Sequence, residues 1–430
     1  MELSVFENRR LELLQCLSGD ALAVIPSATM VLRNRDVHYP FRQHSDFWYL
    51  TGFPEQDAVA VLFKKGDVFR YVLFCQPKDP VAEVWMGERV GVDGACTVFG
   101  ADEAYSIQDF DTVMGRLLQE ASNLYTLSLP QLTVGQYQHS VLSGALAHCR
   151  LTASALEDHL HLMRLTKDEN EMACMRLAAE VSVRAHQQAM RMVRPGMHAY
   201  EVQAALEHVM LASGCHHQAY EPIVAPGKHA CVLHYTDNDA VLCDGDLLLI
   251  DAGAESDYYA CDITRTFPIN GRFTDEQKAL YNVVLDAQNQ VITAIEPGVT
   301  WDVLHALSVK VIVDGLLQLG ILVGDADALI ESQAHKPFYM HGIGHWLGLD
   351  VHDVGSRLDG DQPRRLAPHM VLTVEPGIYI APGSDGIDPK WYGIGIRIED
   401  DVLVTEQGCD VLTESLVKDP DGIEALMQQD

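Results

Sequence analysis

The sequence has few basic residues and no long apolar run. Lys and Arg number 30 against 61 Asp and Glu, which gives a formal net charge of −31. A chain this acidic repels phosphate backbones. No run of about 18 apolar residues is present to span a membrane. We therefore expect neither a nucleic-acid partner nor a membrane partner.

The cysteines are also uninformative as a motif. There are ten of them at irregular spacings, without a Cys-x-x-Cys pair, so neither a zinc–thiolate site nor a dithiol redox motif is predicted. The first twenty residues carry charges throughout and lack the continuous apolar segment of a signal peptide. We expect free thiols and a cytoplasmic location.

Hydrophobic residues make up 48% of the 430-residue chain, which is enough for two or three packed domains. Strand patterns at 21–32, 57–63 and 69–75 and a helical pattern at 111–122 predict an α/β domain over residues 1–165. A second domain is predicted over residues 166–430. It begins with a long amphipathic helix that ends at Pro195-Gly196.

That helix is predicted to start with a capping box formed by Thr166 and Glu169. An apolar stripe at helical spacing predicts its buried face, on which His186 is expected to be a packed histidine. The residues of the stripe are Met172, Met175, Ala179, Val183, His186 and Met190.

The second domain contains a weak internal repeat. RPGMHAYEVQAAL (194–206) resembles EPGVTWDVLHAL (296–307), and GDLLLIDAG (245–253) resembles HMVLTVEPG (369–377). Each half then has a second strand pattern with an acid. The matching order predicts two related α+β halves that face each other, with Asp251 equivalent to Glu375.

The repeat places two acidic residues at equivalent positions in each half: Asp251 and Asp262 in the first, Glu375 and Glu399 in the second. A carboxylate at the end of a buried strand is costly unless it is paired or bound to metal. Any one of them alone could instead turn to solvent or cap a loop. Side chains directly opposed in a hairpin lie about 4.5–5.5 Å apart, so each pair could share a cation. Two divalent cations would balance four carboxylates, and such centres serve hydrolysis.

The stretch HGIGHWLGLDVHD (341–353) is the candidate source of an imidazole ligand. His341 and His345 have the i, i+4 spacing of zinc-binding helices. Gly342 and Gly344 disfavour a helix there, so a loop or an alternating strand is expected. Oxygen-rich sites with one imidazole suit Mn²⁺, but the residues alone leave open which histidine binds it.

The segments LHYTDN, LLLIDAGAESDYYACDITRTFPI, FYMHGIGHWLGLDVHDVG, MVLTVEPGIYI and YGIGIRIEDD together resemble aminopeptidase P, the Xaa-Pro aminopeptidases of the pita-bread metallopeptidase family. The resemblance implies an α/β N-terminal domain followed by an α+β catalytic domain with pseudo-twofold "pita-bread" symmetry. It implies two Mn²⁺ per subunit. Asp262 and Glu399 would bridge the ions, Asp251 would chelate one, and His345 and Glu375 would bind the other.

The same resemblance implies roles around the centre. Glu375 would accept the proton of the attacking water, and His234 and His352 would flank the scissile bond, with ordinary loop histidines as the alternative. Arg397, two residues before Glu399 on a predicted strand, should point to the same face; a surface ion pair is its alternative. The further candidates for substrate binding are His341, which matches a family histidine near the metals, and Tyr379, Arg164 and Trp85. Packing is the alternative for Tyr379 and Trp85, and a salt bridge is the alternative for Arg164.

The implied reaction is hydrolysis of the N-terminal Xaa-Pro bond, which releases the first residue of peptides with proline second. VWMGERVG resembles a stretch that places a tryptophan, here Trp85, near a neighbouring subunit's active site. A homotetramer built as a dimer of dimers is implied, with residues 1–165 serving oligomerisation and shaping of the site. The alternatives are a prolidase restricted to Xaa-Pro dipeptides and a peptide-binding relative without catalysis.

Overall fold

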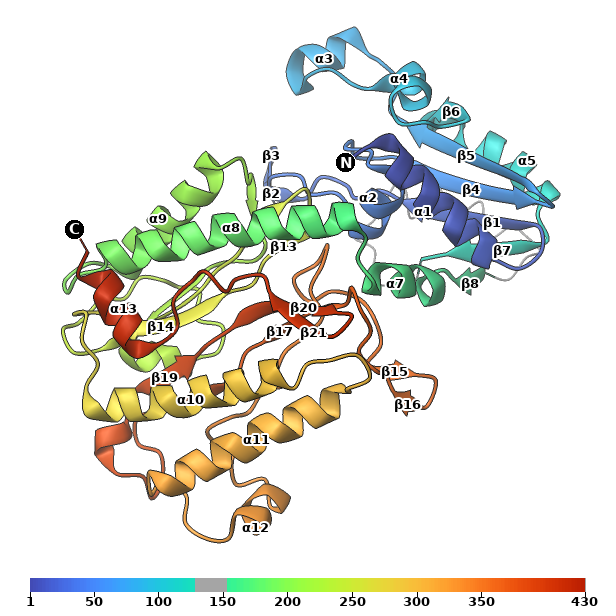
Figure 1. The fold of residues 1–430 in the computed structure, drawn as a ribbon. Helices are drawn as coiled ribbons and strands as arrows, with labels where there is room; N and C mark the ends of the chain where they lie inside the picture. The colour runs from blue at the N-terminus through green and yellow to red at the C-terminus, as the bar shows by residue number, and fades with distance from the viewer. Residues whose placement is uncertain (128–152, 430) are drawn as a thin grey trace. The chain divides into compact units, whose positions relative to one another are not determined.

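A computed structural model describes residues 1–127 and 153–429 of the chain (Figure 1). The chain divides into two units, Met1–Met163 and Arg164–Asp430. The functions expected for the two domains stay predictions.

The first unit is built on a six-stranded mixed sheet in the order β6-β5-β4-β1-β7-β8. The neighbours of β4 are antiparallel to it, whereas β5–β6, β1–β7 and β7–β8 are parallel. The strands are β1 (Ala21–Pro26), β4 (Val59–Lys65), β5 (Val68–Cys75), β6 (Glu103–Ser106), β7 (Asn123–Thr126) and β8 (Ala153–Ala155). The helices are α1 (Leu3–Cys16), α2 (Ser45–Thr51), α3 (Pro80–Met86), α4 (Gly91–Thr97) and α5 (Phe110–Glu120), and α7 (Glu157–Leu165) contains the boundary with the second unit.

These elements confirm the predicted α/β unit, with one boundary corrected. The segment predicted as a strand at 21–32 is a strand only as far as Pro26. Residues from Leu32 belong instead to a small hairpin of β2 (Leu32–Asn34) and β3 (Val37–His38). Proline at the end of β1 offers no backbone N–H to continue the ladder.

The second unit places short sheets between helix pairs; Figure 1 shows α8 on one side of the strands and α10 and α11 on the other. Its helices are α8 (Glu169–Met192), α9 (Ala199–Ala212), α10 (Asp275–Thr293), α11 (Trp301–Gln318), α12 (Ala326–Glu331) and α13 (Pro420–Met427). The first-half strands are β9 (His217–Gln218), β10 (Ile223–Pro226), β11 (Leu247–Asp251), β12 (Ala254–Ser256), β13 (Tyr259–Ala260) and β14 (Thr264–Pro268). The second-half strands are β17 (Val371–Val374), β18 (Gly377–Ile380), β19 (Ile394–Arg397), β20 (Asp400–Thr405) and β21 (Gly408–Val411), and β15 (Leu358–Asp359) and β16 (Gln362–Pro363) form a separate hairpin.

The internal repeat predicted from sequence is present in this unit. Each half has a helix pair, then a strand (β11 or β17), a small ladder (β12–β13 or β18–β19) and a returning strand (β14 or β20). The residue before α9 bridges Val241, six residues before β11, and the residue before α11 bridges Arg365, six residues before β17. These matched contacts confirm the pseudo-twofold α+β fold.

The start of α8 differs from the prediction. Asp168 is the N-cap, and Glu171 completes the capping box. Thr166 lies two residues before this cap, in a β-bridge with Met370. The apolar stripe predicted for this helix is buried, and His186 is buried with it.

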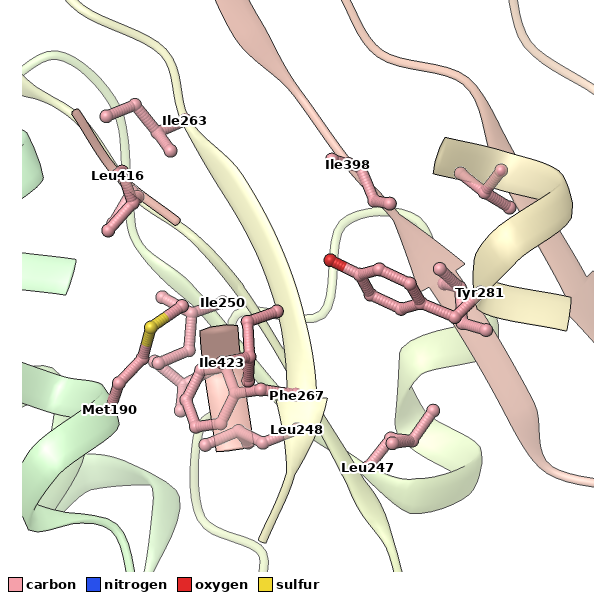
Figure 2. Packing of buried hydrophobic residues seen from close by; sticks show 14 of the residues in the cluster. Met190, Leu247, Leu248, Ile250, Ile263, Phe267, Tyr281, Ile398, Leu416 and Ile423 are labelled. Atoms are coloured by element: carbon pink, nitrogen blue, oxygen red, sulfur yellow. The ribbon is translucent and has the colours of Figure 1, made fainter. Parts of the chain in front are cut away.

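The core of the second unit fixes the direction in which β11 presents its last residue. Leu248 and Ile250 pack with Phe267 and Met190 in one cluster, which Figure 2 shows from close by. Leu249, on the opposite face of the strand, packs in a second cluster. Because side chains alternate along a strand, Asp251 emerges on the face of Leu249, opposite to Leu248 and Ile250.

Two expectations about the whole chain can be compared with the described residues. The cysteines within these residues are free thiols, as predicted; Cys149 lies outside them. In the ranges 1–127 and 153–429, no helix combines the length and the apolar composition needed to cross a membrane.

Candidate metal centre

The predicted acids and histidines meet in one cavity of about 260 Å³ in the second unit. Its wall holds all five predicted ligands and four of the other candidates. The lining residues are Leu233, His234, Asp251, Asp262, His341, Gly344, His345, His352, Glu375, Arg397 and Glu399.

The two halves deliver their acids in similar ways. Asp251 is the last residue of β11, and Glu375 directly follows β17. Asp262 and Glu399 lie in the short connections before β14 and β20. Direct opposition of Asp251 and Asp262, the condition under which the sequence let them share a cation, is not present, since Asp251 pairs with Thr264. The separate β12–β13 ladder shifts Asp262 beyond the end of the main pairing.

The glycine two residues after the first acid of each half explains how the second acid comes close. A Cβ on Gly253 would lie 1.7 Å from the carbonyl oxygen of Cys261, next to Asp262. A Cβ on Gly377 would lie 2.9 Å from the carbonyl oxygen of Ile396, three residues before Glu399. The acid-x-Gly pattern therefore reflects a requirement for close backbone approach.

His345 has the environment of a metal-binding imidazole. It lies in a loop, as the glycines of HGIGH predicted. Its Nδ1 lies 2.9 Å from the Trp346 carbonyl, which fixes the ring. Its Nε2 faces Asp262 Oδ2 at 3.3 Å and Glu375 Oε1 at 3.8 Å. A backbone carbonyl on one ring nitrogen and acids around the other are typical of a ligating histidine.

The charges of the site also fit divalent cations. Burial raises the pKa of Asp251, raises that of Glu375 to about 7, and raises that of Glu399 well above its usual range. Burial acts the same way on Asp262, but the hydrogen bond and charge of His345, with Tyr220 and Arg397, together outweigh it and lower that pKa. Ligand atoms of Asp262, His345 and Glu399 all lie within 4.8 Å of one another. So many buried carboxylates at one point require positive charge to ionise together.

His345 couples metal binding to protons. Burial favours its neutral form, yet the hydrogen bond and the charge of Asp262 raise its pKa to about 9. A cation must displace this proton to reach the Nε2 lone pair. Metal affinity should therefore rise with pH.

Several neighbouring side chains hold the carboxylates in place. Arg397 Nη2 donates to Asp251 Oδ2 at 2.6 Å, and Thr264 Oγ1 donates to Glu399 Oε2 at 2.7 Å. The Tyr220 hydroxyl lies 2.6 Å from Asp251 Oδ1 and 2.5 Å from Asp262 Oδ1. Sequence reasoning missed Tyr220 and Thr264, because neither lies in a pattern that distinguishes it from a packing residue.

His341 belongs to a hydrogen-bonded chain that begins at Arg397. Arg397 Nη1 donates to the Tyr379 hydroxyl at 3.1 Å, which lies 2.9 Å from His341 Nε2. His341 Nδ1 lies 2.8 Å from the Gly342 carbonyl and so must carry the proton. Burial lowers the pKa of His341 to about 4, so the ring is neutral and its Nε2 accepts from Tyr379. Arg397 thus organises the pocket wall by holding Asp251 directly and His341 through Tyr379.

His234 and His352 lie on the cavity wall beside the predicted ligands. The His352 ring packs edge-on against His345, with centroids 4.2 Å apart. Burial, together with the nearby His345, lowers the pKa of His352. Both histidines are therefore placed to face a substrate in the cavity, and their catalytic roles stay predictions.

Three predicted residues are not part of the cavity wall. Tyr379 is buried beside it and reaches it through hydrogen bonds with Arg397 and His341. The buried Arg164 guanidinium pairs with Asp353 at 2.5 Å and with Asp350 at 2.8 Å; among the described residues it is not part of the cavity wall. Trp85 lies on α3 of the first unit and is 83% exposed. Direct substrate contacts for these three residues stay predictions.

A fold of two related halves that gathers four carboxylates around His345 in one cavity is typical of a metallopeptidase. Residues 173–406 match the model of metallopeptidase family M24, and residues 6–125 match the aminopeptidase P N-terminal domain. The Xaa-Pro aminopeptidase of Escherichia coli strain K12 is 43% identical over 435 residues, covering 98% of this chain and 97% of the relative. The chain therefore belongs to the aminopeptidase P, or Xaa-Pro aminopeptidase, group of family M24.

Solved structures agree with this placement. The Pseudomonas aeruginosa aminopeptidase PepP matches with a TM-score of 0.95 at 47% identity, over 99% of this chain and 98% of that chain. Proline aminopeptidase P II from Yersinia pestis matches with a TM-score of 0.96 at 44% identity, over 99% of each chain.

Proposed function

We propose that this protein is an Xaa-Pro aminopeptidase, a hydrolase that cleaves the bond between the first residue of a peptide and a proline at the second position. The observation that carries the proposal is the convergence of Asp251, Asp262, His345, Glu375 and Glu399 in one cavity. The names of its full-length relatives supply the proline specificity.

We further propose that these five residues hold two Mn²⁺ ions per subunit. Oxygen donors with one imidazole suit this ion, and two dications balance the four carboxylates. When bound, the ions supply Lewis acidity that polarises the scissile carbonyl and activates water. Tyr220, Thr264 and Arg397 keep the carboxylate oxygens in place.

The chain's own residues then handle the substrate and the proton. Glu375, on the cavity wall, accepts a proton from the attacking water on a carboxylate oxygen. His234 and His352 orient the substrate carbonyl and the proline ring. The acidic wall of the cavity attracts the positively charged amino group of the peptide. The bond cleaved is a tertiary amide without an N–H, so the site needs no acceptor there.

The test is release of arginine from Arg-Pro-Pro and from Arg-Pro, after chelation and again with added Mn²⁺. Cleavage of the tripeptide that is lost with the metal and restored by Mn²⁺ supports the proposal. Cleavage of the dipeptide alone would favour a prolidase. Cleavage of neither peptide by a metal-loaded protein would favour a peptide-binding relative.

We also propose a cytoplasmic homotetramer in which the first unit serves assembly and places Trp85 near a neighbouring subunit's site. Support comes from the exposed apolar side chains on α3, where Val81, Val84 and Met86 accompany Trp85. Sedimentation velocity should give the mass of four chains. A monomer at micromolar concentration would contradict this assembly.

A further inference from the structure

A charged network is buried beside the predicted metal ligands. Arg265 of β14 pairs with Asp400 of β20 at 2.6 Å, and neither side chain is exposed to solvent. Asp400 also accepts from Thr413 at 2.7 Å, from Lys418 at 2.7 Å and from Gln288 of α10 at 3.1 Å. The network therefore joins the first half of the unit, the second half and the helix packed on them.

The donors of this network end on backbone carbonyls that flank the ligands. Arg265 Nη1 donates to the carbonyl of Glu399 itself at 2.6 Å and to that of Thr264, two residues after Asp262, at 3.0 Å. Gln288 Nε2 lies 3.2 Å from the carbonyl of Val374, the residue before Glu375. The network thus binds a backbone carbonyl at, or within two residues of, three of the four predicted carboxylate ligands, Asp262, Glu375 and Glu399.

A buried charged network of this kind is not the most stable way to fill a core. A buried ion pair gains little net stability over well-packed apolar side chains of similar volume. Unlike apolar side chains, the rigid guanidinium group of Arg265 and the amide of Gln288 provide oriented hydrogen-bond donors. Each donor fixes the position of a particular carbonyl. The cost is explained if the positions of those carbonyls matter.

We propose that Arg265 and Gln288, oriented by Asp400, are positioning residues for the metal centre. They set the separation between the acid of the first half, Asp262, and the acids of the second half, Glu375 and Glu399. This inference rests on the proposed two-metal site. It assigns the network a role in metal affinity beyond its role in folding.

The test compares Gln288→Met with Gln277→Met. Gln277 lies on the same helix, is also buried, and donates to a backbone carbonyl, that of Gly245, away from the predicted ligands. Both substitutions remove a buried amide donor and should lower the melting temperature. Only Gln288→Met should weaken Mn²⁺ binding, by about 10–100-fold in equilibrium dialysis.

A second variant, Arg265→Lys, keeps the charge that faces Asp400 and removes the fork. It should also weaken Mn²⁺ binding, and it gives an independent result should Gln288→Met fail to fold. The inference is overturned if folded Gln288→Met or Arg265→Lys protein binds Mn²⁺ as tightly as the wild-type chain, or if Gln277→Met weakens binding equally.

The dialysis readout separates this inference from the proposed activity. A wild-type chain that binds Mn²⁺ and does not cleave Arg-Pro-Pro would contradict the proposed activity, while weaker binding by the two variants would still support the positioning role. A wild-type chain that binds no Mn²⁺ would overturn both.

Discussion

Replacing Arg164 by methionine separates a structural role from a role in substrate binding. Arg164 and Asp353 are almost fully buried, with side chains 2% and 1% exposed. Removing one partner of a buried ion pair costs about 3–5 kcal/mol. Asp353 keeps Lys167 at 3.0 Å, and the lost partner Asp350 is 38% exposed, so the lower end applies, about 3 kcal/mol. At about 2–4 °C per kcal/mol for a unit of this size, the melting temperature should fall by roughly 6–12 °C.

The assay is calorimetric melting alongside kcat and KM for Arg-Pro-Pro. The matched control is Arg176→Met, which removes the exposed pair of Arg176 with Asp410 and should cost less than about 1 kcal/mol. A melting temperature for Arg164→Met within 1 °C of wild type, together with a tenfold rise in KM, would refute this reasoning and support direct substrate binding.

Three further predictions concern the site and its surroundings. Glu375→Gln should lower kcat for Arg-Pro-Pro by about 10²–10⁴-fold by removing the proton acceptor; a loss under tenfold would contradict that role. Tyr220→Phe should weaken Mn²⁺ binding by about tenfold, because two carboxylates lose their hydroxyl contact; unchanged binding in dialysis would argue against it. Burial lowers the pKa of His186 to about 4 in the folded chain. Between pH 6.5 and 4 the unfolded chain therefore binds one more proton at this residue than the folded chain, and stability decreases as the pH is lowered. Relative to His186→Gln, the wild-type chain should lose up to about 3 kcal/mol over that window in urea unfolding; parallel pH profiles would contradict the assignment.

Much of the second unit could be predicted from sequence because both halves of the repeat have the same pattern of apolar strands, acids and glycines. An apolar strand that ends in acid-x-Gly points to a buried carboxylate and to a close backbone approach, and Gly253 and Gly377 have such approaches. The glycines of HGIGH correctly excluded a helix around His345.

What the pattern missed depends on pairing register and on contacts between distant segments. The β12–β13 ladder moves Asp262 out of direct opposition to Asp251, and nothing in the spacing of the acids marks that shift. Tyr220 reaches both acids from a different part of the chain. The cap of α8 is Asp168 with Glu171, while Thr166 pairs with the distant segment around Met370, a contact that the sequence does not mark.

The central claim is that five side chains hold two divalent cations. Anomalous diffraction at the manganese edge, from crystals equilibrated with Mn²⁺, tests it most directly. The account predicts two peaks in the cavity bounded by Asp251, Asp262, His345, Glu375 and Glu399. A single peak there would contradict the two-metal centre, and no peak in the cavity would contradict the whole account of the site.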